Sequence, residues 1–91
     1  MAVLVIGEVS GGTAERDSAV VDALGLKDNP LAGARFRVAG PSENGWRVVS
    51  LWDSREQFDQ FVEERLKPAL EQVGIAPPSF EFWPIESVIV R

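Results

Sequence analysis

The spacing of hydrophobic residues changes several times along this chain, and each change marks the start of an expected element. Residues 2–9 are almost uniformly apolar, which is typical of a buried central strand. Residues 14–24 carry Val20 and Leu24 on one helical stripe, and we expect charged residues such as Asp17 to point outward. Residues 34–39 alternate between apolar and charged side chains. The first part of the chain therefore predicts a strand, a helix and a second strand.

The clearest pattern is a strand that runs directly into a long amphipathic helix. The side chains on one face of this strand would be Trp46, Val48, Ser50 and Trp52, and those on the other would be Arg47, Val49, Leu51 and Asp53. Both faces carry large apolar residues, so neither is suited to bulk water. Ser54 and Gln57 form a capping box, and apolar residues follow at helical spacing. Pro68 interrupts that pattern and predicts a kink or break near residues 66–67.

Capping residues mark the ends of both expected helices. Thr13 is an expected N-cap for the first helix. Gly25 and Gly74 each stand where a left-handed residue would end a helix, and each is followed by an apolar residue, Leu26 or Ile75, that can fold back. The two halves of the chain therefore predict helices that end in the same way.

Turn-forming residues separate the remaining elements. A loop is expected over residues 27–33, and the dense turn signal at 40–45 predicts an antiparallel hairpin. The last strand is expected to start near residue 79, with Pro84 changing its pairing or causing a bulge. Residues 86–90 would then form a further extended piece.

The resulting order, β-α-β-β-α-β, predicts an α+β, ferredoxin-like domain over residues 1–91. Both helices would cover one face of a four-stranded antiparallel sheet. The other face is also apolar, and a bare apolar face of that size is unusual on a soluble monomer. We therefore expect a homodimer in which two sheets stack about a two-fold axis, with residues 86–90 reaching the neighbouring subunit.

Composition excludes many classes of function. The chain has no His, Cys or Tyr, which excludes ordinary zinc sites, His- or Cys-ligated haem, and Ser-His-Asp or Cys-His catalysis. A net charge of −5 argues against a nucleic-acid partner, and no apolar run is long enough to span a membrane. No targeting segment is visible, so we expect a cytoplasmic protein. Proton transfer would fall to carboxylates, lysines or the substrate itself.

The stretch VAGPSENGWRVVSLWDSREQFDQFVEERLKPALEQVGI, with its W-x-S-x-E-x-F motif, resembles the dimeric α/β-barrel superfamily. Within it, the chain is most similar to the antibiotic-biosynthesis-monooxygenase-like group and its small actinobacterial relatives. The resemblance implies a ferredoxin-like protomer, a two-fold dimer and a small-molecule pocket in each protomer. It also implies cofactor-free oxygenation, cyclisation or isomerisation of aromatic metabolites, although some members only bind ligands.

The same resemblance suggests which residues would act. A tryptophan at the end of the third strand in the oxygenases matches Trp52, whereas the asparagine four residues before it is replaced here by Val48. Small relatives place histidines where Arg37 and Glu86 stand, so an opposite-charge pair would replace two imidazoles. The first departure separates the chain from the oxygenase pattern, and the second separates it from the small relatives.

Each candidate residue has a structural alternative. Trp52 would orient a carbonyl with its indole N–H, or simply fill the core. Arg37 would hold a carboxylate or enolate while Glu86 acts as base, or the two would form a salt bridge or be solvated. Glu8 would be a base if it is buried; the alternative is an edge or strand-end position without a role in catalysis. The expected ligand contacts are Glu8, Phe36, Val48, Ser50 and Trp83, with packing or an interface as the alternative for Trp83.

Two functions remain open from the sequence. The first is an enzyme without cofactor or metal, similar to a monooxygenase, cyclase or isomerase, that acts on an aromatic or polyketide-like metabolite in an apolar pocket. The second is a dimeric module that binds a ligand or supports another enzyme without catalysis.

Overall fold

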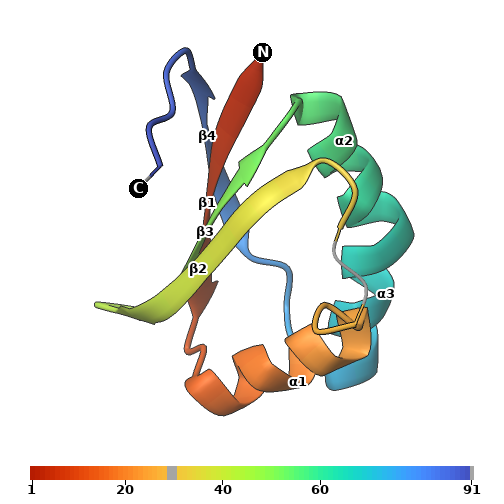
Figure 1. The fold of residues 1–91 in the computed structure, drawn as a ribbon. Helices are drawn as coiled ribbons and strands as arrows, with labels where there is room; N and C mark the ends of the chain where they lie inside the picture. Colours follow the sequence, from red (N-terminus) through yellow and green to blue (C-terminus); the bar gives the residue numbers. More distant parts are fainter. Residues whose placement is uncertain (29–30, 91) are drawn as a thin grey trace.

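The chain folds around one four-stranded antiparallel sheet with the strand order β2-β3-β1-β4, and its helices pack on one face of that sheet (Figure 1). This computed structural model describes residues 1–28 and 31–90. The elements in chain order are β1 (Ala2–Ser10), α1 (Ala14–Leu24), β2 (Ala34–Ser42), β3 (Gly45–Trp52), α2 (Arg55–Phe61), the π-helical segment η1 (Val62–Leu66), α3 (Lys67–Val73) and β4 (Ser79–Ile85). The predicted α+β ferredoxin-like fold is confirmed. Asn29 and Pro30, in the expected loop, lie outside the described residues.

The register between β1 and β3 determines which side chains face the helices. Val5 pairs with Ser50, and Val3 pairs with Trp52. Val3, Val5 and Trp52 form a buried cluster with Phe58 of α2. The Trp46–Trp52 side of β3 therefore faces the helices, because side chains alternate along a strand. We call this side the inner face and the opposite side the outer face.

The β2–β3 hairpin confirms the predicted pairing but is longer than predicted. Ser42 still pairs with Gly45, so the expected turn residues Gly40–Ser42 belong to the strand. Pro41 is tolerated because β2 is an edge strand, where amides on one side have no neighbour. The register shifts between Ala34 and Phe36, so these two residues do not share a face as the simple alternation predicted.

The last strand corrects two predictions. β4 pairs with β1 from Ser79 to Ile85 without a register shift, so the interruption expected at Pro84 is wrong. β4, like β2, is an edge strand, and an edge strand accommodates a proline, which has no backbone N–H to donate. Residues 86–90 are not a strand; they run back along the outer side of the sheet, away from the helices (Figure 1). Ile89 and Val90 are exposed there.

The helix ends follow the predicted caps. Thr13 Oγ1 accepts the Arg16 amide at 3.2 Å, and Ser54 Oγ accepts the Gln57 amide at 3.2 Å. Gly25 ends α1 in the left-handed region with φ 68°, and Gly74 ends α3 with φ 81°. These four residues fix where α1 begins and ends, where α2 begins and where α3 ends.

Pro68 changes the second helix without breaking it. The backbone N–H of Lys67 donates to the Val62 carbonyl, five residues earlier, which is a π-helical bond. The predicted kink thus takes the form of η1, and Pro68 falls in the first turn of α3, where no amide is needed. Among the described residues, no helix has the length and apolar character needed to cross a membrane.

Candidate functional site

An apolar cavity of about 110 Å³ lies between the inner face of the sheet and the helices. Its wall comes from every layer: Val5 from β1, Val20 from α1, Val48 from β3, and Phe58 from α2. The few polar side chains on the wall are Thr13, Arg16, Asp17, Arg37, Ser50 and the indoles of Trp46 and Trp52. A mostly hydrophobic wall with a few placed polar groups is the usual form of a small-molecule site.

Trp52 closes one end of this cavity as part of an aromatic cluster. It is only 2 % exposed. Its ring centroid lies 5.1 Å from that of Phe61 and 5.4 Å from that of Phe58, the second pair edge to face. These distances suit attractive aromatic contacts. Trp52 is therefore a core residue that also forms part of the cavity wall.

The indole N–H of Trp52 already has an acceptor inside the protein. Its Nε1 donates to Ser50 Oγ at 2.9 Å, between two residues on the same face of β3. The carbonyl-orienting role predicted for this N–H would require that bond to break. The Ser50–Trp52 bond instead holds the tryptophan ring in one orientation.

Arg37 reaches the cavity from β2, where it pairs with Ser50 across the strands. Its guanidinium donates two hydrogen bonds to the Asp17 carboxylate of α1, one of them from Nη1 at 3.3 Å. The two side chains are 28 % and 16 % exposed. This bidentate pair joins β2 to α1 at the cavity wall.

Asp17 was missed as a site residue because charged positions of the first helix were expected to face water. Asp17 precedes Val20 by three positions and Leu24 by seven, so it belongs to the buried stripe of α1. That spacing, together with the inward-facing Arg37 on the neighbouring strand, was the signal that could have identified it.

Trp46 is the second residue absent from the predicted site, although the sequence placed it on the same strand face as Ser50 and Trp52. It lies on the cavity wall, and its Nε1 is buried without a hydrogen-bond acceptor among the described residues. Its backbone position is tight, because a methyl group on Gly12 would come within 2.7 Å of the Trp46 Cβ. Trp46 thus brings a buried, unpaired donor to the cavity.

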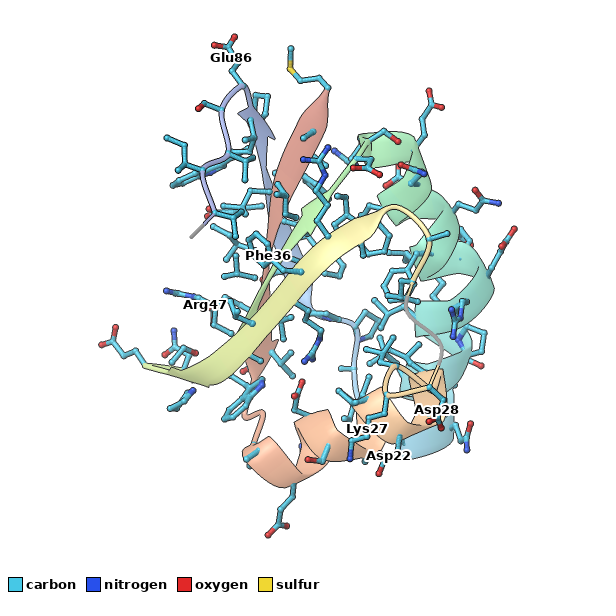
Figure 2. The ribbon with its side chains drawn as sticks, in the orientation of Figure 1. Asp22, Lys27, Asp28, Phe36, Arg47 and Glu86 are labelled. Atoms are coloured by element: carbon cyan, nitrogen blue, oxygen red, sulfur yellow. The ribbon has the colours of Figure 1, made fainter. Side chains whose placement is uncertain are left out.

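Glu8, predicted as a ligand contact or base, lies on the outer face. It accepts hydrogen bonds from Arg47 and from Ser42 Oγ, the latter at 2.9 Å. These bonds, chiefly that from Arg47, hold the pKa of Glu8 below its ordinary value, whereas the base role assumed a raised pKa. Figure 2 shows Arg47 on the side of the sheet away from the helices.

The structure does not bring Glu86 or Trp83 to the cavity. Glu86 follows β4 at the opposite end of the molecule from α1 and points into solvent (Figure 2). Arg37 is paired with Asp17, so the expected Arg37–Glu86 pair is absent from the described contacts. Trp83 is 54 % exposed on the outer face, opposite Leu4 of β1.

The remaining predicted contacts divide between the two faces. Val48 and Ser50 line the cavity from β3. Phe36 borders it from β2, but it pairs with Leu51 and its side chain is 41 % exposed. The described residues contain no group of three or more acidic side chains arranged to hold a metal ion.

Comparison with solved structures gives the class of protein. A candidate antibiotic biosynthesis monooxygenase from Caulobacter crescentus superposes with a TM-score of 0.71 and 17 % identity, over 93 % of this chain and 91 % of its own. SnoaB, a cofactor-independent oxygenase from Streptomyces nogalater, superposes with a TM-score of 0.64 and 12 % identity, over 99 % of this chain and 96 % of its own. A dimeric ferredoxin-like protein of unknown function from Thermobifida fusca superposes with a TM-score of 0.66 and 14 % identity, over 93 % of this chain and 92 % of its own.

The chain therefore has the ferredoxin-like fold of antibiotic-biosynthesis-monooxygenase-type proteins, as the resemblance predicted. At these identities the likeness concerns the fold. No protein-family model matches the sequence, and neither does any curated protein.

Proposed function

We propose that this protein binds a compact aromatic metabolite in the inner cavity and converts it without a resident cofactor. The cavity itself is the observation that carries the proposal: about 110 Å³, lined by aromatic and aliphatic side chains. An apolar protein cavity of about 150 Å³ takes up benzene. At about 110 Å³ this cavity is smaller than that, so its volume favours a ligand with no more than one ring over the larger polyketides that the sequence resemblance suggested.

The polar groups on the wall suggest how such a ligand would react. Asp17 is the carboxylate of the cavity and would accept a proton from the bound ring, with Arg37 stabilising the charge. In a cofactor-free oxygenation the substrate supplies all the electrons: in a phenol, a ring C–H and the O–H give the two carbonyls of a quinone, one atom of O2 enters the product and the other leaves as water. SnoaB, which shares the fold, is a cofactor-independent oxygenase, and this supports that reaction type.

Two measurements test this proposal in sequence. Single-ring phenols and cyclic ketones are screened by thermal shift and tryptophan quenching, and each binder is then assayed for O2 uptake and product. We expect Asp17→Asn to abolish turnover while Asp22→Asn, a matched change on the exposed side of α1, does not. Full turnover in Asp17→Asn would contradict the role of Asp17, and no binder across the set would contradict the cavity as a site.

A non-catalytic ligand-binding module is the second candidate, and one observation favours it. Four of the polar side chains on the cavity wall already bond to each other, Trp52 to Ser50 and Arg37 to Asp17. Neither Glu8 nor Glu86 supplies a free base there. Saturable binding without O2 uptake, isomerisation or any product would support this second function.

We infer that the functional unit is a homodimer formed through the outer face. Phe36, Val38 and Trp83 are 41 %, 56 % and 54 % exposed on that face. Residues 86–90, with the exposed Ile89 and Val90, lie on the same side of the sheet (Figure 1). Exposed apolar clusters of this kind mark interaction surfaces. The described dimeric state of the Thermobifida fusca protein supports the same arrangement.

Light scattering tests the dimer directly. We expect a particle of twice the 10.0 kDa chain mass, and Trp83→Glu should shift it to the monomer. Gln72→Glu adds the same charge at an exposed position of α3 and should leave the dimer intact. A stable monomer of the unmodified chain at micromolar concentration would contradict this inference.

One domain over residues 1–91 and a cytoplasmic location stay predictions of the sequence.

A further inference from the structure

The indole N–H of Trp46 is a buried hydrogen-bond donor on the cavity wall without a partner among the described residues. The other indole donor on the wall, Trp52, bonds to Ser50, and the guanidinium of Arg37 bonds to Asp17. Trp46 Nε1 is buried, and it has no acceptor among the described residues. Buried donors are rarely left without a partner, so such a group needs an acceptor from outside the fold.

We propose that Trp46 Nε1 binds an acceptor oxygen on the ligand, so that the ligand is a single-ring carbonyl compound such as an aryl ketone. This inference rests on the proposed function and specifies the substrate class for the same cavity. An apolar ring fits the wall described above, and a carbonyl oxygen supplies the one acceptor that the wall lacks. A pure hydrocarbon ligand would leave the N–H unpaired and lose that hydrogen bond.

The register places Trp46 at the end of the cavity opposite Trp52. Trp46, Val48, Ser50 and Trp52 follow one another on the inner face of β3, and residues six apart on a strand lie roughly 20 Å from each other. On the neighbouring β2, Arg37 faces Ser50 and Pro41 faces Trp46. The backbone of Arg37 therefore lies nearer to the Ser50–Trp52 end than Trp46 does.

This order along the strand gives the ligand an orientation. With its oxygen on Trp46 Nε1, a single ring would lie over Val48, whose side chain forms the middle of the cavity floor. The ring carbon farthest from the oxygen would then point toward Ser50. Trp46 is thus a binding residue that sets the orientation of the ring in the cavity.

The backbone around Trp46 supports a fixed ring position. Gly12 packs so closely against it that a methyl group there would stand 2.7 Å from the Trp46 Cβ, and Gly45, with φ 151°, lies against the Val9 carbonyl. These contacts leave the start of β3 little freedom to move. The backbone that carries the donor is therefore held in place, which reduces the entropy lost when a ligand binds.

A matched pair of ligands tests the inference by NMR. The chain has three tryptophans, so its three indole N–H resonances are assigned from single Trp→Phe variants. Acetophenone carries the acceptor oxygen and ethylbenzene has nearly the same shape without it. We expect acetophenone to move the Trp46 indole proton downfield in a saturable way, while ethylbenzene does not and the Trp83 resonance stays in place.

Affinities in the variants complete the test. Trp46→Phe should weaken acetophenone binding about two- to tenfold, the range for one hydrogen bond, and should leave the ethylbenzene affinity nearly unchanged. Trp83→Phe on the outer face is the matched control and should change neither. Equal loss for both ligands would mean that Trp46 acts by shape alone.

The outcomes separate this inference from the proposed function. If both compounds shift the methyl resonances of Val48 but the Trp46 indole proton does not move, the cavity stands and the role of Trp46 is overturned. If neither compound shifts any cavity resonance at millimolar concentration, the proposed function fails and this inference fails with it.

Discussion

Ser50 and Trp52 lie two residues apart on the inner face of β3, and Trp52 Nε1 donates to Ser50 Oγ at 2.9 Å within the cavity wall. This bond satisfies the indole of the most deeply buried large side chain. It also means that a tryptophan at the end of the third strand, which the sequence resemblance connects with oxygenase chemistry, has a structural partner here.

Replacing Ser50 by Ala removes the acceptor and leaves a buried indole N–H unpaired. We expect the free energy of unfolding to fall by about 1–3 kcal/mol, the usual effect of one unsatisfied buried donor. Urea denaturation measures this change. Ser79→Ala, at the exposed start of β4, is the control and should alter stability much less. An equal loss in both variants would argue that the Ser50–Trp52 bond contributes nothing.

The Arg37–Asp17 pair should show energetic coupling in a double-mutant cycle. Both side chains are more than two-thirds buried and the contact is bidentate. We therefore expect Arg37→Gln and Asp17→Asn to be coupled by about 1 kcal/mol or more in unfolding free energy. The exposed Arg55–Asp59 pair on α2 is the reference and should give about 0.5 kcal/mol or less. Purely additive effects at Arg37 and Asp17 would contradict the bidentate contact.

Glu8 should make stability depend on pH at the acidic end. Its pKa is lowered in the folded protein by Arg47 and Ser42, so the charged form stabilises the fold above the ordinary pKa of 4.5. That contribution disappears as the pH falls through the lowered pKa. We expect the difference in Tm between the unmodified protein and Glu8→Gln to be constant above about pH 5.5 and to shrink toward pH 3.

A second variant assigns this effect to its cause. In an Arg47→Gln background the same Glu8→Gln comparison should show a much smaller pH dependence, because the first cause of the shift is gone. A difference in Tm that grows on acidification would have the wrong sign for a lowered pKa.

Gly74 should be needed for its backbone conformation alone. It ends α3 with φ 81°, and a methyl group there would meet no atom within 4 Å. Gly74→Ala should therefore lower the free energy of unfolding by about 1–2 kcal/mol through backbone strain only. Gly40→Ala also enters open space but without a positive φ, and it should be nearly neutral. Similar effects at both positions would argue against the left-handed helix end.

The elements of this fold were predictable because local chemistry and hydrophobic spacing agree. Thr13, Ser54, Gly25 and Gly74 cap helices where the sequence predicted. Two errors share one cause: Pro41 was assigned to a turn and Pro84 was expected to change the pairing of its strand. Both lie on edge strands, and which strands are at the edge depends on the order of the whole sheet.

The site was predictable only in part, because it depends on contacts between distant segments. Trp52, Arg37, Val48 and Ser50 were chosen from strands whose inner face the sequence left open, and the structure brings them to one cavity. Glu86 was paired with Arg37 by analogy alone. The true partner Asp17 is twenty positions away from Arg37 on another element. The unpaired indole N–H of Trp46 can be recognised only when the positions of the neighbouring acceptors are known.

A crystal structure of the protein soaked with 4-bromoacetophenone tests the account most directly. Anomalous scattering locates the bromine without ambiguity. We predict one bromine per chain inside the cavity, on the side of Ser50, with the ketone oxygen on Trp46 Nε1. Bromine found only on the outer face of the sheet, with the cavity filled by its own side chains, would contradict the account.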